Sequence, residues 1–225
     1  MFSEKRIVRI AVGFLLLGLT AQTELQEPFG LPTFAVEDPL LQATWEDLRE
    51  KIHADRAIIS QCRVQREDCL SPVALRFIAI VAEGEPHQGL ARIGHINRAV
   101  NFSIRGNKKA PPGEWTSPLA ALTEGSGDCK QHAILKYVAL RDAGFSAEAV
   151  RVVIVGDRLL HQQHALVAVH EAGRWLFLDN HSSILVEASQ LSKRYTPLNV
   201  LDQAGVRTFA RPSYQVQKSS SSEGG

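Results

Sequence analysis

The hydrophobic pattern of this 225-residue chain changes near Gly144, and this change limits the folds that the chain can adopt. Before Gly144, apolar residues recur at helical spacing. The predicted helices cover about residues 40–60, 74–82, 88–102 and 129–143. After Gly144, the apolar runs are short, rich in valine and aromatic residues, and typical of strands. The predicted strands cover residues 147–156, 164–170 and 174–179. Helices followed by strands predict an α+β fold with a small antiparallel sheet.

The first 21 residues have the pattern of a secretory signal peptide. Lys5, Arg6 and Arg9 are followed by an apolar stretch at 10–19, which is short for a membrane span. Ala21 suits the last position before a cleavage site. We therefore expect a periplasmic or secreted protein with no membrane span after cleavage. An uncleaved anchor and a buried N-terminal helix are the alternatives.

The rest of the chain divides into three parts. Three prolines interrupt residues 22–39, which we predict to be an extended arm. Residues 40–212 are long enough for a single domain with its own core. The serine- and glycine-rich residues 213–225 predict a disordered tail. A net charge of +1 with 22% charged residues argues against a nucleic-acid partner, because such proteins show a basic face.

The three cysteines fall into a close pair and a single residue. Cys62 and Cys69 are near enough in sequence to form a disulfide across a turn, and disulfides persist in exported proteins. Two unpaired cysteines near a helix end are the alternative. Cys129 is left over, and is either an intermolecular partner or a free reactive thiol.

Cys129 falls in the first turn of a predicted helix, where Ser126 or Asp128 can act as N-cap. Unpaired N–H groups there favour an anion, and a thiolate is the nucleophilic form of cysteine. The alternative is that Cys129 is a small buried residue.

The last two predicted strands bring a histidine and an aspartate to one face. A four-residue turn between them pairs His170 with Trp175. His164 and Asp179 then become diagonal neighbours, because side chains alternate along a strand. A carboxylate in that place can orient the imidazole as a general base. A surface histidine and an aspartate that begins a turn with Asn180 are the alternatives.

The residues around these positions resemble the bacterial transglutaminase-like cysteine peptidases, a group that includes periplasmic proteases of the adhesin-releasing type. The resemblance spans about residues 90–182 and is carried by RIGHINRAVNFSI, WTSPLAALTEGSGDCKQHAILKYVALRDAGF, QHALVAV and WLFLDN. It implies a papain-like, transglutaminase-like core that hydrolyses peptide bonds through a thioester acyl-enzyme. The implied substrate is a protein, with a cell-surface adhesin as the candidate partner.

The resemblance also assigns roles to individual residues. Cys129 matches the family's nucleophile, His164 its histidine and Asp179 its aspartate. The oxyanion would be held by the backbone N–H of Cys129 and by a side-chain donor. Trp115 is the candidate for that donor, and a core aromatic residue is the alternative role for it.

One departure from the family concerns calcium. Calcium-dependent members have acidic residues around the cysteine, in a pattern like DCED, whereas this chain has Asp128-Cys129-Lys130-Gln131. Calcium needs several oxygen ligands, usually including carboxylates, and Lys130 supplies none. We therefore expect no required cofactor, and calcium binding at Asp128 that is weak or absent.

Three other functions fit parts of the pattern. A zinc site could draw on Cys129 and four histidines. His161 and His164 are three residues apart, however, and along a strand this spacing directs their side chains to opposite faces. The histidines concerned are His161, His164, His170 and His181. A non-catalytic module of the same fold could bind a peptide or an adhesin. A transglutaminase would pass the acyl group to an amine, and the sequence does not separate this reaction from hydrolysis.

Overall fold

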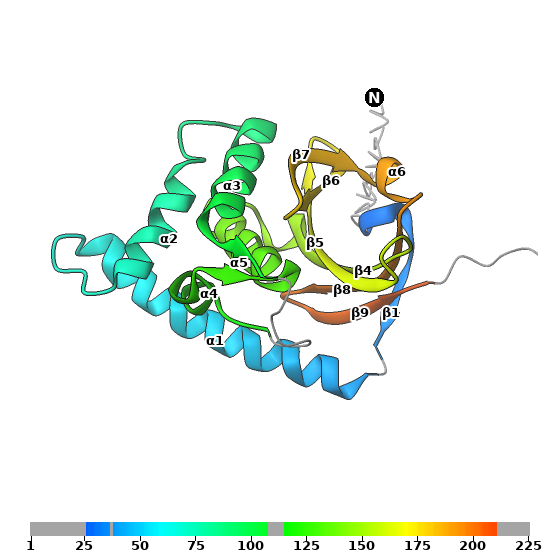
Figure 1. Ribbon diagram of the computed structural model, residues 1–225, viewed down its shortest axis with the longest axis horizontal. Helices are drawn as coiled ribbons and strands as arrows, with labels where there is room; N and C mark the ends of the chain where they lie inside the picture. Colours follow the sequence, from blue (N-terminus) through cyan, green and yellow to red (C-terminus); the bar gives the residue numbers. More distant parts are fainter. Residues whose placement is uncertain (1–25, 37, 108–114, 211–225) are drawn as a thin grey trace, which may run out of the picture.

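The computed structural model describes residues 26–36, 38–107 and 115–210. The helices that precede residue 144 lie on one side of the molecule, and a curved sheet lies on the other (Figure 1). The predicted signal peptide at 1–21 and tail at 213–225 lie outside the described residues. Within the part of the chain that is described, none of the helices is both long and apolar enough to cross a membrane.

The helical side contains the four predicted helices and one short helix that the pattern did not predict. Its members are α1 (Pro39–Val64), α2 (Pro72–Ala82), α3 (Gly89–Ser103), α4 (Pro118–Glu124) and α5 (Cys129–Asp142). Proline at the first helical position and a capping side chain fix two of the starts. Asp38 accepts the backbone N–H groups of Leu40 and Leu41 before α1, and Ser71 accepts that of Ala74 before α2.

Helix α5 lies at the centre of the molecule (Figure 1). It packs against β4 and β5 on one side and against α2, α3 and α4 on the other. Its residues from Gln131 to Leu140 are all buried, polar ones included. The long helix α1 also reaches the sheet, where the Trp45 indole N–H donates to the backbone oxygen of Asp202 at 2.9 Å. Helices and sheet therefore share one core.

The sheet has seven antiparallel strands in the order β1-β9-β8-β4-β5-β6-β7. Its strands are β1 (Thr33–Ala35), β4 (Val150–Asp157), β5 (Gln162–Glu171), β6 (Arg174–Asp179), β7 (Ser182–Glu187), β8 (Tyr195–Asp202) and β9 (Gly205–Phe209). The three predicted strands are β4, β5 and β6, and His170 does pair with Trp175. The sequence pattern missed the other four, so the sheet is larger than predicted.

The described residues also form several short elements. They are η1 (Pro28–Gly30), β2 (Arg105–Gly106), β3 (Ser126–Gly127), η2 (Ala147–Ala149) and α6 (Ala188–Leu191). Strands β2 and β3 pair in parallel, so the end of α3 runs beside the residues that precede Cys129. The described residues of the segment expected to be an extended arm form η1 and β1 and pack against the sheet. Its strand β1 pairs with β9, and Glu27 forms ion pairs with Arg151 and Arg207.

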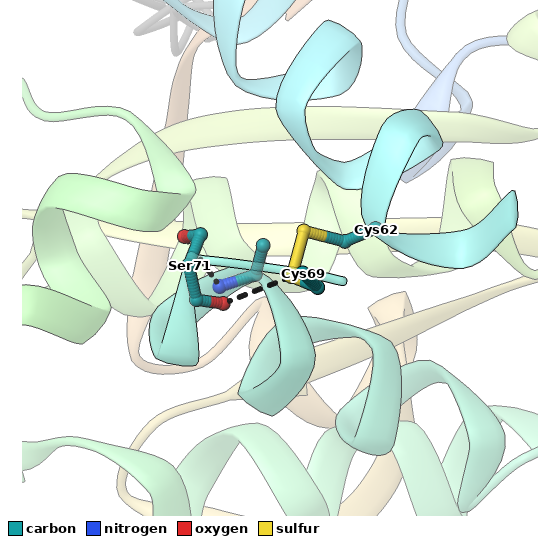
Figure 2. Close-up of a disulfide and its surroundings, with 4 residues drawn as sticks. Cys62, Cys69 and Ser71 are labelled. Carbon is teal, nitrogen blue, oxygen red and sulfur yellow. Dashed lines mark hydrogen bonds between the residues drawn. A yellow bond between two sulfur atoms is a disulfide. The ribbon is translucent and has the colours of Figure 1, made fainter. Parts of the chain in front are cut away.

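A disulfide closes the turn between α1 and α2. Figure 2 shows Cys62, in the last turn of α1, bonded to Cys69 close to Ser71, the residue that caps α2. The two Cα atoms are 4.8 Å apart. The loop is short, so the constraint that it places on the unfolded chain is modest.

Replacing both Cys62 and Cys69 by serine is therefore expected to lower the free energy of unfolding by about 2–3 kcal/mol. Urea unfolding of the two proteins under oxidising conditions measures the difference. The same measurement in the presence of a strong reductant is the control, because reduction should bring the wild type close to the variant. Equal stability under oxidising conditions would contradict a stabilising disulfide.

Candidate active site

Cys129 is the first residue of α5, and its position depends on the cap before it. The Asp128 carboxylate accepts the N–H of Lys130 at 2.7 Å, and the Gln131 side chain accepts the N–H of Asp128 at 3.0 Å. The Asp128 side chain also accepts the backbone N–H of Gln131, so Asp128 and Gln131 form a reciprocal capping box, which identifies Asp128 rather than Ser126 as the N-cap. Gly127 is required for it, since a Cβ there would lie 2.5 Å from the Gln131 side chain. The free thiol thus lies at a well-formed helix N-terminus.

The sheet brings His164 and Asp179 into direct contact. His164 lies near the start of β5 and Asp179 ends β6. The His164 Nε2 atom is 3.0 Å from Asp179 Oδ1. His164 also shares a hydrogen bond with the side chain of Cys129. Because Nε2 faces Asp179, Nδ1 is the nitrogen left for the thiol. The structure therefore brings the three predicted residues together in the order Cys129, His164, Asp179.

The pKa values of His164 and Asp179 favour an ion pair. Burial alone would lower the pKa of His164, but hydrogen bonds and charge interactions with Asp179 and Cys129 outweigh it and raise this pKa to about 9. Burial alone would raise the pKa of Asp179, but its interactions with His164 and the N–H of His181 hold it well below its usual value. At neutral pH a positive imidazolium thus faces the sulfur of Cys129.

Two further rings surround His164. His181 lies nearly parallel to it, with ring centroids 5.1 Å apart, and Tyr195 lies within 20° of parallel at 5.6 Å. Both also bind Asp179. The backbone N–H of His181 donates to Oδ1 at 3.0 Å, and the Tyr195 hydroxyl donates to Oδ2 at 3.2 Å. Sequence reasoning missed Tyr195, because it belongs to a strand that the pattern did not predict.

Lys136 is a buried cation near the same site. It lies seven residues after Cys129, which is about two helical turns, and only 1% of it is exposed. Burial lowers the pKa of Lys136 to about 7, while the charge of Asp179 acts in the opposite direction. Sequence reasoning missed the burial of Lys136, because a lysine in a predicted helix normally lies on its solvent face.

Trp115 lies in the core beside the helices. It is partly buried and packs against the main hydrophobic cluster. Its ring meets that of Trp45 edge-on, with centroids 6.4 Å apart. These contacts fit the alternative role of a core aromatic residue. The oxyanion role of Trp115 stays a prediction.

The histidines do not gather as a zinc site would require. His161 is exposed in the turn before β5, and His170 packs edge-on against Trp175. Among the described residues, the group close enough to share an ion is His164, Asp179 and His181, within 4.8 Å of one another. The rings of its two histidines are within 10° of parallel. Imidazole lone pairs lie in the ring plane, so two stacked rings do not point at a common ion, and the geometry fits hydrogen bonding better than zinc.

The residues around Asp128 do not fit a calcium ion either. Its carboxylate accepts the N–H of Lys130 and also forms an ion pair with the Lys130 ammonium. No other carboxylate in the described ranges joins Asp128 in a group that could hold a metal. The ammonium of Lys130 thus lies where a cation would otherwise be attracted.

Calcium is therefore expected to leave the protein unchanged. The melting temperature in 1 mM CaCl2 should match that in EGTA, because only an ion that binds the folded state shifts it. The rate at which iodoacetamide modifies Cys129 should match as well. A Lys130→Glu variant is the comparison, since it restores a carboxylate beside Asp128. A rise in the wild-type melting temperature with calcium would show that a site exists.

Comparisons with known proteins agree with this fold. Three solved structures of Legionella pneumophila LapG share the fold at 17–18% identity. One has a TM-score of 0.57 and covers 67% of this chain and 87% of its own. The match to the calcium-bound form has a TM-score of 0.57 and covers 71% of this chain and 93% of the LapG chain. The match to the EGTA-treated form has a TM-score of 0.56 and covers 68% of this chain and 90% of the LapG chain. A sequence search of the curated proteins found no match.

A family model covers most of the folded chain. The model of the bacterial transglutaminase-like cysteine proteinases matches residues 52–206, which run from within α1 into β9 and include all three predicted catalytic positions. The expected α+β, transglutaminase-like fold is thereby confirmed, together with the expected class of enzyme. This chain belongs to the family of bacterial transglutaminase-like cysteine proteinases.

Proposed function

We propose that this cysteine peptidase is an exported endopeptidase that cleaves a protein substrate with the triad Cys129, His164 and Asp179. One observation carries the proposal. His164 lies between a carboxylate at 3.0 Å and the only cysteine outside the disulfide, and that cysteine begins a capped helix. This is the nucleophile, base and orienter arrangement of covalent catalysis.

The reaction follows from the charges. The Cys129 thiolate attacks the scissile carbonyl carbon, and the backbone N–H of Cys129 donates to the oxygen that becomes negative. Trp115 remains the candidate for a second donor. The His164 imidazolium gives its proton to the leaving amine, so the carbon–nitrogen bond breaks and a thioester remains. The now neutral His164 takes a proton from water, which attacks the thioester; the carbon–sulfur bond breaks, the acid leaves, and the Cys129 thiolate and the His164 imidazolium are restored.

Export and substrate class rest on the sequence. The N-terminal pattern of basic and apolar residues, and the disulfide between Cys62 and Cys69, both fit a periplasmic or secreted protein. The resemblance to the adhesin-releasing type supports a cell-surface protein as substrate. The Asp128 carboxylate caps α5 and pairs with Lys130, which supports activity without calcium.

The test compares the purified wild type with Cys129→Ala on a cell-surface protein fraction from the source cells. New N-termini are labelled and identified by mass spectrometry. The proposal expects termini that appear with the wild type alone. The same set of termini with both proteins would overturn it.

The same experiment separates the alternatives. A biotinylated amine added to the reaction should stay unincorporated, whereas a transglutaminase would attach it to protein. A binding module fixed to a column would retain a surface protein equally well with Cys129 or with alanine at that position. It would produce no new N-termini. Either result would replace the proposal.

A further inference from the structure

The two oxygens of Asp179 have different partners. Oδ1 accepts from His164 Nε2 at 3.0 Å and from the backbone N–H of His181 at 3.0 Å. Oδ2 accepts from the Tyr195 hydroxyl at 3.2 Å. A carboxylate held through one oxygen alone can still rotate about its Cβ–Cγ bond. The bond to Tyr195 fixes the other oxygen, and with it the plane of the group.

Tyr195 is itself held firmly. It starts β8, pairs with Asp157 of β4, and is 1% exposed. The neighbouring Arg194 lies over its ring at 5.0 Å and binds the Asp157 carboxylate at 2.7 Å. A buried hydroxyl is costly unless it is hydrogen-bonded, and phenylalanine would fill the same space without that cost. The hydrogen bond to Asp179 therefore accounts for a tyrosine, rather than a phenylalanine, at this buried position.

The Tyr195 hydroxyl stays protonated and so remains a hydrogen-bond donor. Burial, followed by the charge of Asp179, raises the pKa of Tyr195, so the phenol keeps its proton at any working pH. The other charged groups near the pair come from each surrounding element. They are Cys129 and Lys136 on α5, His164 on β5, His181 after β6, Arg194 before β8 and Asp157 on β4.

We propose that Tyr195 is a positioning residue for the triad: its hydroxyl fixes the Asp179 carboxylate in the plane from which Oδ1 orients His164 toward Cys129. The inference rests on the proposed function. Tyr195 does not touch the reacting atoms, and it acts through Asp179 and His164. Its effect should therefore appear in the titration of His164 and in the reactivity of Cys129.

The test uses Tyr195→Phe, which keeps the ring and removes only the hydroxyl. Tyr137→Phe is the matched control, because Tyr137 is also buried but packs its ring against Trp45. NMR of histidine-labelled protein follows the midpoint of His164, and iodoacetamide followed by peptide mass analysis gives the alkylation rate of Cys129. Thermal unfolding checks that both variants fold.

A positioning role predicts two changes in folded Tyr195→Phe. The His164 midpoint should fall below the wild-type value of about 9, because the carboxylate that raises it is less well aligned. The alkylation rate of Cys129 at pH 7 should drop about three- to tenfold, the range expected for one lost hydrogen bond. Tyr137→Phe should change neither quantity.

An unchanged midpoint with an unchanged rate would overturn the inference. A raised midpoint would overturn it too, since Tyr195 would then compete with His164 for Asp179. His164→Ala separates this from failure of the proposed function. If His164→Ala leaves alkylation as fast as in the wild type, the triad itself is absent. If His164→Ala slows alkylation and Tyr195→Phe does not, only the role of Tyr195 fails.

Discussion

Alanine in place of His164 is expected to lower kcat for peptide cleavage by about 10⁴-fold or more, and Cys129→Ala should lower it by a similar factor. In the proposed mechanism, His164 supplies both the charge that stabilises the thiolate and the proton for the leaving amine. Cys129 supplies the bond to the substrate. Because the two act as one unit, the double variant should be no worse than either single variant. Initial rates on a peptide from an identified cleavage site measure all three.

Two comparisons sharpen this test. Asp179→Ala should cost less than His164→Ala, because the aspartate only orients and stabilises the imidazole. His170→Ala is the matched control, since His170 lies on the same strand and packs against Trp175, away from the triad. Losses that add up in the Cys129 and His164 double variant would mean that the two residues do not act together.

Methionine in place of Lys136 is expected to stabilise the protein by about 2–4 kcal/mol at pH 6, and by less at higher pH. The pKa of Lys136 is about 7 in the folded state, against 10.5 for an ordinary lysine. Between these values the unfolded chain binds a proton that the folded chain does not, so wild-type stability gains with rising pH. Below pH 7 the folded protein holds a buried charge, and the advantage of methionine is complete.

Urea unfolding at pH 6 and at pH 9 measures this difference. His164, whose pKa is raised, contributes the opposite trend, with stability that is complete below pH 6.5 and lost as the pH passes about 9. That contribution is common to both proteins and cancels in the comparison. Lys193→Met is the control, because Lys193 is exposed and its removal relieves no cost of burying a charge. A Lys136→Met protein that is less stable at pH 6 would mean that attraction to Asp179 outweighs the cost of burial.

Local patterns predicted those parts of the fold that are set by neighbours in sequence. The helices follow from apolar spacing and caps, and the β5–β6 hairpin follows from its tight turn with Gly173. Strand β8 was missed because it contains Pro197, which is rare within a sheet. Pro197 is accommodated where the pairing of β4 and β8 shifts register. The placement of β8 beside β4, rather than beside β7, depends on contacts between residues that are far apart in the sequence.

The same distinction applies to the candidate site. Cys129 at a helix start, and His164 with Asp179 on a hairpin, are features that short segments show. Tyr195 reaches Asp179 because β8 pairs with β4. The residue pattern of a short segment does not predict that pairing. Lys136 is buried because α5 is enclosed by other helices and by the sheet, so the usual rule that charges mark the solvent face does not hold there.

The proposed triad is divided between the two halves of the molecule. Cys129 belongs to the helical half, and His164 and Asp179 belong to the sheet. Neither half contains a working site, so the thiol gains its partner only when α5 docks against β5. A chain that crosses a membrane before it folds, as the proposed export implies, would travel with an unactivated cysteine. Its proteolytic activity would begin only after α5 and the sheet have docked, and therefore after export.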